Sequence, residues 1–139
     1  MTAKTATRLG NAMVTDVVKY DLDGINVDDE YSSCSGSASS FYAVLKAIRS
    51  NPYFSGKTLS KALWSDSQYF RSPNNAANQL TEGYEMTYAG SVSYLTPYVG
   101  YGMSKSSLFL GISPEFSSAS QAHSIAQNVA SGGYQGVMI

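Results

Sequence analysis

Short apolar segments alternate with amphipathic helical patterns along this chain, and that alternation constrains its fold more than any other feature. The spacing of apolar residues predicts helices over residues 4–20, 40–49 and 122–130. Apolar runs bounded by glycine, proline or polar clusters predict strands at 22–27, 58–64, 84–88, 107–112 and 133–139. A short helix is expected within 72–83, and 91–103 fits either loop or helix. This order of elements indicates an α/β protein with repeated βα units and a parallel sheet.

Composition and charge exclude several kinds of partner. The net charge is −1 and the basic residues are scattered, so neither nucleic acid nor an anionic membrane surface is expected to bind. No apolar run approaches the roughly 20 residues that a membrane-spanning helix needs. The single cysteine, Cys34, has no disulfide partner and no histidine cluster beside it, so no metal and no cofactor is expected. We expect Cys34 to be a free thiol in a Ser/Gly loop and His123 to lie on the surface.

Tyrosine is unusually frequent, with 11 Tyr against 5 Phe and 1 Trp. Such rings offer both a hydroxyl and a stacking face, which suits carbohydrate, although tyrosines half-buried on an α/β surface would explain the same count. Trp64, at the end of the second predicted strand, could stack on a sugar or pack in the core. Asp66 and Tyr98 are further candidates for substrate binding, with ordinary loop positions as the alternative.

Acidic residues gather in the run from residue 20 to residue 31. Asn26, Asp28 and Glu30 occupy every second position, so in a strand all three project from one face. Two carboxylates and an amide at the carboxyl end of a parallel strand are costly to bury for stability alone. Crowding also raises the pKa of an acid beside apolar surface, as a general acid near neutrality requires. The pattern favours catalysis, with a solvent-exposed acidic strand end as the alternative.

The spacing of Asp23, Gly24, Asp28 and Glu30 resembles the D-G-x-D-x-D-x-E signature of glycoside hydrolase family 18. The wider string LDGINVDDEYS is similar to the L-D-G-V-D-F-D-D-E-Y form of bacterial endo-β-N-acetylglucosaminidases of the H type. Chitinases of this family usually carry tryptophan before or beside the glutamate, whereas Asp29 holds that place here. The resemblance therefore favours the endoglycosidase branch.

The resemblance also implies a parallel (β/α)8 barrel of the TIM type. The rest of the chain can be aligned in order, from the helix before barrel strand 4 to barrel strand 8, and Met86-Thr87-Tyr88 resembles the M-x-Y of strand 6. A complete barrel typically needs about 250 residues. We therefore expect residues 1–139 to form a single domain, a partial barrel with five βα units, whose unpaired sheet edges would permit self-association.

What the resemblance implies about chemistry is a substrate-assisted retaining mechanism, in which the 2-acetamido group of the substrate is the nucleophile. Glu30 would be the general acid and base, and Asp28 would accept the acetamido N–H. Tyr88 would donate to the acetamido oxygen, while Asp23 and Gly24 complete the structural motif. The family usually has aspartate where this chain has Asn26, and an amide would alter the coupling of protons along the strand.

The activity implied is hydrolysis of the GlcNAc-β-1,4-GlcNAc bond in N-glycan cores. A chitinase would use the same residues on a polymer of the same disaccharide. Two further alternatives are a barrel that only binds N-acetylglucosamine-containing glycans, which Asn26 favours, and a truncated barrel without independent function. By resemblance to the family, a secreted or periplasmic protein is expected.

Overall fold

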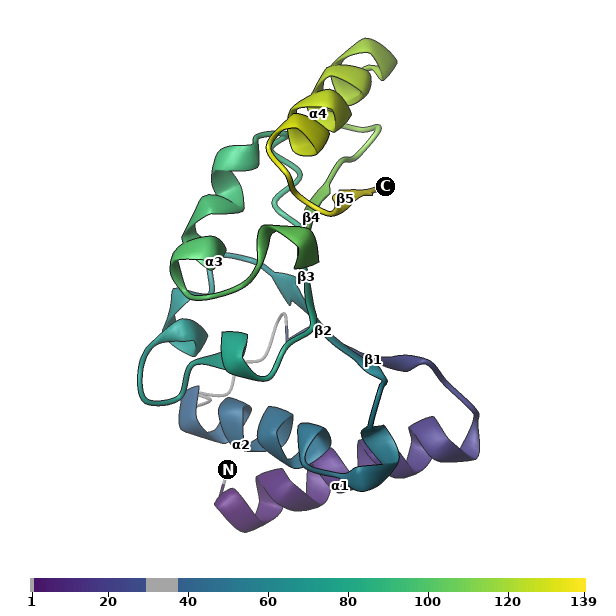
Figure 1. Cartoon of the computed structure of the whole chain (residues 1–139), viewed down its shortest axis with the longest axis vertical. Coiled ribbons are helices and arrows are strands. Elements are labelled where there is room, and N and C mark those ends of the chain that lie inside the picture. Colours follow the sequence, from purple (N-terminus) through teal and green to yellow (C-terminus); the bar gives the residue numbers. More distant parts are fainter. Residues whose placement is uncertain (1, 30–37) are drawn as a thin grey trace.

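The computed structural model of the chain describes residues 2–29 and 38–139 (Figure 1). Glu30 and Cys34, both singled out above, lie outside the described residues. Five strands form one parallel sheet in the order in which they occur along the chain: β1 (Gly24–Val27), β2 (Thr58–Leu63), β3 (Glu82–Glu85), β4 (Leu108–Gly111) and β5 (Gly136–Met138). The predicted α/β architecture with five parallel strands is confirmed.

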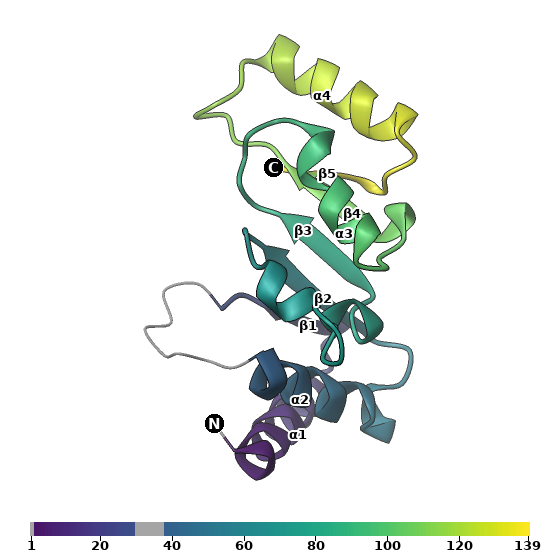
Figure 2. The same ribbon diagram turned by 90° about the vertical axis from the view of Figure 1, so that its left-hand side faces the viewer.

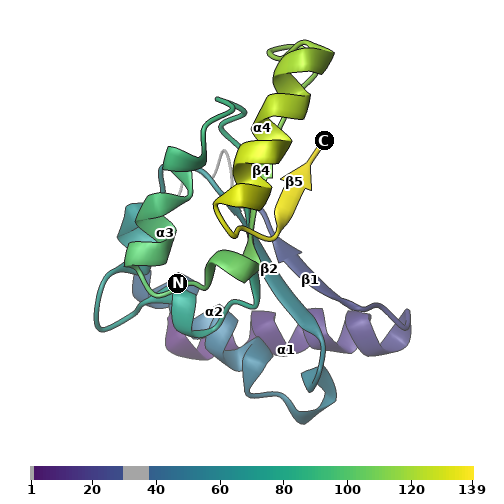
Figure 3. The same cartoon turned by 45° about the horizontal axis from the view of Figure 1, so that its top comes forward.

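Helices lie on one side of this sheet. The α-helices are α1 (Ala3–Lys19), α2 (Ala38–Arg49), α3 (Thr96–Gly100) and α4 (Ala119–Ser131). Short 3₁₀ turns lie in the connections between these elements: η1 (Pro52–Phe54), η2 (Ser67–Phe70), η3 (Ala76–Asn78), η4 (Val92–Tyr94) and η5 (Lys105–Ser107). In Figure 1 the strands trace an arc from β1 to β5 with α2, α3 and α4 outside it, and Figure 3 also places β1 and β5 on the side away from α3. The inner side of the arc is open, as in a barrel cut lengthwise.

The hydrophobic core lies between the sheet and the helices. Leu59 and Leu63 of β2 and Leu108 and Leu110 of β4 are fully buried there. They occupy alternate positions because successive strand residues point to opposite faces. The opposite face carries polar and aromatic side chains, among them the stacked rings of Tyr84 and Phe109, whose centroids are 4.7 Å apart.

Two helices meet closely at one end of the sheet, where Figure 2 shows α1 beside α2. At Gly10 a Cβ atom would lie 2.8 Å from the carbonyl oxygen of Val44 and 2.9 Å from the Cβ of Ala47. Only glycine leaves room for this approach, which buries Val14 and Val17 of α1 in the core.

Among the described residues, no helix is both long and apolar enough to cross a membrane.

Most predicted elements agree with the structure, but the third strand does not. It was expected at 84–88, whereas β3 covers Glu82–Glu85. The N–H of Thr87 donates to the carboxylate of Glu85 at 2.9 Å, and Tyr88 has a left-handed φ of 56°. A strand cannot continue through that conformation. The short helix expected within 72–83 is the 3₁₀ turn η3, and the undecided segment 91–103 contains η4 and α3.

Candidate active site

The first strand carries the acid-rich segment to the carboxyl-terminal edge of the sheet. Ile25 and Val27 pack against the core, whereas Asn26, between them, is exposed on the opposite face. The Ser60 hydroxyl of β2 donates to the Asn26 side-chain oxygen at 2.8 Å. Asp28 follows the strand directly and is also exposed. Asn26 and Asp28 thus follow the predicted alternation, and the placement of Glu30 on the same face stays a prediction.

Gly24 of the motif has a structural reason to be glycine. A Cβ atom there would collide with the carbonyl group of Thr58 on β2. The N–H of Thr58 donates to the carbonyl oxygen of Asp23 at 3.0 Å, so the two strands are already in register at this point. The pair of residues fixes the position at which the acid-bearing strand enters the sheet.

Asp29 points the other way, into a buried polar network that sequence reasoning missed. The ammonium group of Lys61, on β2, lies 2.9 Å from Asp29 Oδ1 and 2.6 Å from Asp66 Oδ2. Lys61 is only 1% exposed, and the rings of Phe41 and Tyr69 lie 5.6 Å and 5.4 Å from its nitrogen. A lysine in the middle of a buried parallel strand needs such partners, because an unpaired buried ammonium is costly.

The network sets the charge state of its members. Burial pushes the pKa of Asp29 upward, but hydrogen bonds from Lys61 and Tyr69 outweigh burial and hold that pKa below its ordinary value. Burial, with the carboxylate of Asp29 beside it, raises the pKa of Tyr69 to about 12. Asp29 is therefore negatively charged at neutral pH, which makes it unsuitable as a proton donor.

Trp64, Asp66 and Tyr98, the predicted substrate-binding residues, fall in two different places. Trp64 follows β2 at the carboxyl-terminal edge and is 52% exposed, so it does not belong to the core. Asp66 is buried, and the Tyr98 hydroxyl donates to its Oδ1 at 2.8 Å. Burial, followed by the charge of Asp66, raises the pKa of Tyr98. Both residues line a pocket of about 390 Å³ together with buried Glu85. Their role in substrate binding stays a prediction.

Tyr88 stands at the same edge, just beyond β3. It is partly buried, and its ring lies against Gly111 of β4, where a Cβ atom would be 3.1 Å from two ring carbons. In the sheet, β2 lies between β1 and β3. Asp28 follows β1 and Tyr88 follows β3, so the two residues lie beyond strands that are not adjacent. Carboxyl ends of parallel strands form the reactive edge of βα barrels, and both predicted catalytic residues are found there.

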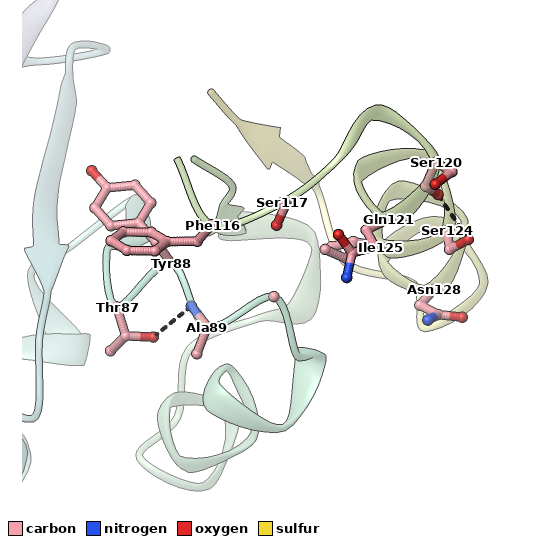
Figure 4. Close-up of a pocket in the computed structure, with 11 residues that line it drawn as sticks. Thr87, Tyr88, Ala89, Phe116, Ser117, Ser120, Gln121, Ser124, Ile125 and Asn128 are labelled. Atoms are coloured by element: carbon pink, nitrogen blue, oxygen red, sulfur yellow. Dashed lines mark hydrogen bonds between the residues drawn. The ribbon is translucent and has the colours of Figure 1, made fainter. Parts of the chain in front are cut away.

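Tyr88 lines a pocket of about 620 Å³ (Figure 4). One wall is the loop after β3 and the other is α4 with the loop before it. The lining residues are Thr87, Tyr88, Ala89, Gly90, Phe116, Ser117, Ser120, Gln121, Ser124, Ile125 and Asn128. Sequence reasoning used the apolar stripe of α4 and overlooked its polar face. The available signal was Phe116, a lone large ring in the polar run 113–121.

Metal ligation has no support in this part of the chain. Within residues 2–29 and 38–139, no group of three or more His, Cys, Asp or Glu side chains is placed to hold a metal ion. His123, on α4, is exposed, in agreement with the prediction of a surface histidine.

A parallel sheet in sequential strand order, with helices outside and polar side chains at the carboxyl ends, defines the class of fold as part of a TIM-type βα barrel. No protein-family model and no curated protein matches the chain. Among solved structures, an endo-β-N-acetylglucosaminidase from Cordyceps militaris is similar over 98% of this chain, with a TM-score of 0.67 and 21% identity.

Two chitinases from Ostrinia furnacalis are similar over less of the chain. The Group IV chitinase in complex with allosamidin matches 74% of it, with a TM-score of 0.55 and 15% identity. The second catalytic domain of the Group II chitinase matches 76%, with a TM-score of 0.54 and 19% identity. This chain spans 52% of the Cordyceps chain and 38% and 40% of the two Ostrinia chains. The likeness confirms the predicted fold, a partial TIM-type barrel.

Proposed function

We propose that this chain carries five βα units of a family 18 glycoside hydrolase barrel and acts as an endo-β-N-acetylglucosaminidase on N-glycan cores. The observation that carries the proposal is the motif from Asp23 to Glu30, of which residues 24–27 form a parallel strand in a barrel-type sheet and Asp28 follows the carboxyl end of that strand. The similarity to the Cordyceps endo-β-N-acetylglucosaminidase over nearly the whole chain supports the family 18 fold, which the Ostrinia chitinases share.

In the proposed mechanism, Glu30 gives its proton to the glycosidic oxygen as the bond to the anomeric carbon breaks. The acetamido oxygen of the same sugar attacks that carbon and forms an oxazolinium ion, and Glu30 then takes a proton from the water that opens the ion. Asp28 accepts the acetamido N–H and stabilises the positive charge that develops. Tyr88 donates its hydroxyl proton to the acetamido oxygen in a hydrogen bond.

Asn26 gives this site an unusual neighbour for Asp28. Its side-chain oxygen already accepts from the Ser60 hydroxyl at 2.8 Å, so the amide is oriented by β2. An amide does not ionise, so Asn26 does not supply the carboxylate that is usual at this place in the family.

A chitinase is the second candidate, since the Ostrinia chitinases share the fold. The ion pair of Asp29 weighs against it. Chitinases usually carry tryptophan before or beside the glutamate, and here the side chain after Asp28 is held by buried Lys61. A tryptophan at that position would leave Lys61 with one carboxylate partner fewer.

The test is glycan release from a high-mannose glycoprotein by the 139-residue chain, run beside Glu30→Gln and Asp28→Asn. Cleavage by the parent that leaves one N-acetylglucosamine on the protein, seen by mass spectrometry, is the expected result, and both variants should lose it. Faster cleavage of chitin oligosaccharides would favour the chitinase. Absence of cleavage with either substrate would rule out hydrolysis by this chain and leave either the non-catalytic glycan-binding barrel or the truncated, inactive barrel.

A further inference from the structure

The pocket beside Tyr88 has a chemical character of its own. We propose that it is a sugar-binding subsite for an uncharged branch of the glycan, with Phe116 as the stacking ring and the polar face of α4 as the source of hydrogen bonds. The proposal rests on the proposed function for the identity of the ligand as a glycan. It adds a substrate preference, for neutral over acidic glycans, and a set of residues outside the catalytic motif.

The two walls of the pocket are held at a fixed separation. Gly90, in the loop after β3, has a φ of +69°, and a Cβ atom there would lie 2.9 Å from Cδ1 of Ile125 on α4. The loop and the helix therefore touch at this point, and both Gly90 and Ile125 line the pocket. At the other end of the wall, the side chain of Thr87 accepts from the N–H of Ala89 at 3.4 Å and orders the loop (Figure 4).

The helical wall presents a single polar face. Gln121, Ser124, Ile125 and Asn128 follow the i, i+3, i+4, i+7 spacing, so they lie together along α4. A capping box fixes the start of this helix: the Gln121 side-chain oxygen accepts from both the N–H and the hydroxyl of Ser118 at 2.8 Å. The carbonyl end of Gln121 is thus occupied, and its amide nitrogen is the end that can donate to a ligand.

An exposed aromatic ring completes the wall on the loop before α4. Phe116 is 69% exposed and is one of the residues that line the pocket. A sugar ring that stacks on Phe116 would remove part of this apolar surface from water. The C–H face of a sugar ring fits such a surface, while its hydroxyl groups need the amide and hydroxyl partners that α4 provides.

Charge defines which glycans fit. None of the residues that line the pocket is Asp, Glu, Lys, Arg or His. An acidic sugar or a phosphate would enter without a cation to pair with, at a desolvation cost. A neutral hexose or N-acetylhexosamine meets no such penalty. The volume of about 620 Å³ lies within the range of roughly 300–1,000 Å³ for ligand sites.

Tyr88 connects this pocket to the proposed reaction centre. The same side chain lines the pocket and is the proposed donor to the acetamido group. A sugar that fills the pocket is therefore the neighbour of the sugar that reacts, and the pocket extends the substrate site toward α4.

The test uses the ¹⁵N-labelled Glu30→Gln chain, in which binding is measured without turnover. It is titrated with a free neutral high-mannose oligosaccharide and, separately, with the same oligosaccharide carrying a phosphate on its mannose branch. We expect amide shifts to gather in residues 87–90 and 116–128 and the neutral glycan to bind at least about tenfold more tightly, an equilibrium difference of about 1.4 kcal/mol. Phe116→Ala should weaken binding by about threefold to tenfold, the range for loss of an aromatic stacking partner.

Tyr53→Ala is the matched control, because Tyr53 is 72% exposed, similar to Phe116, and lies on η1 away from the pocket. Its affinity for the glycan should equal that of Glu30→Gln alone. Equal effects of the two alanine variants, shifts confined to other residues, no shifts at all, or equal binding of the phosphorylated glycan would each overturn the subsite. Failure of hydrolysis in the earlier assay, with shifts in 116–128 intact, would refute the proposed reaction and leave the subsite standing.

Discussion

Replacement of Lys61 by methionine is expected to destabilise the protein by about 3 kcal/mol. Removal of one partner from a buried ion pair typically costs about 3–5 kcal/mol, because the other charge is left uncompensated. Here the two carboxylates differ: the side chain of Asp66 is 5% exposed, whereas that of Asp29 is 26% exposed. Water can solvate Asp29 after the change, and Tyr98 still donates to Asp66, so the lower end of the range is expected.

Urea unfolding followed by circular dichroism measures this change directly. A loss of about 3 kcal/mol is a large part of the roughly 5–15 kcal/mol of a typical domain and lowers Tm by about 10 °C at this size. Lys19→Met is the matched control, since Lys19 is exposed and contacts only the Tyr20 ring, 4.6 Å from its nitrogen, among the interactions described for its side chain. That variant should stay within about 0.5 kcal/mol of the parent.

A second substitution tests the cause. In Lys61→Met/Asp66→Asn the buried negative charge is gone, and the amide oxygen can still accept from Tyr98. The double variant should therefore recover at least half of the lost free energy of unfolding. If Lys61→Met unfolds like the control, or if Asp66→Asn recovers nothing, the buried charge does not govern stability and the reasoning is wrong.

Three further changes probe pKa shifts and close packing. The pKa of Asp29 lies below its ordinary value of 3.8. Its contribution to stability is therefore complete above pH 3.8 and is lost as the pH falls through the lower folded-state pKa. In urea unfolding, Asp29→Asn should reduce the fall in the free energy of unfolding at acid pH. Burial raises the pKa of Glu85 above 4.5. The stability that its protonated form contributes is therefore present below pH 4.5 and is lost as the pH rises. The free energy of unfolding of Glu85→Gln should increase relative to that of the parent between about pH 4 and 8. Gly111→Ala should cost about 1–3 kcal/mol in thermal unfolding, because the new Cβ collides with the carbonyl oxygen of Glu85 and also meets the ring of Tyr88. Gly100→Ala, with open space around it, should not.

Periodicity was sufficient to predict the architecture. The helices at 4–20, 40–49 and 122–130 and the order of five strands follow from apolar spacing, because each element must turn an apolar face to the same core. The third strand was the exception. Its end depends on the turn of Thr87 toward the carboxylate of Glu85 and on the left-handed φ of Tyr88, and neither is encoded in alternation.

The candidate site was predictable only in part. A local pattern placed Asn26 and Asp28 on one face of a strand, because both belong to the same short segment. Lys61 and Asp66 come from another part of the chain, and their contact with Asp29 depends on the register between β1 and β2. The pocket beside Tyr88 depends likewise on the packing of α4 against a loop some thirty residues earlier, which no single segment reveals.

Asp28 and Asp29 have the same side chain, yet the alternation of a strand assigns them to opposite sides. Asp28 is exposed on the open face, whereas Asp29 is tied to Lys61 and, through it, to Asp66. A buried ion pair of this kind is a weak source of net stability, since apolar side chains of similar volume can replace it without loss. Its contribution here is geometric, because it joins the carboxyl end of β1 to β2 and to the segment before η2. The double variant Lys61→Met/Asp66→Asn can therefore be more stable than Lys61→Met alone although it lacks the ion pair that joins β2 to Asp29. Any difference in glycan release between that variant and Asp66→Asn alone, in which Lys61 still pairs with Asp29, would then measure what the link does for the segment that leads to Glu30.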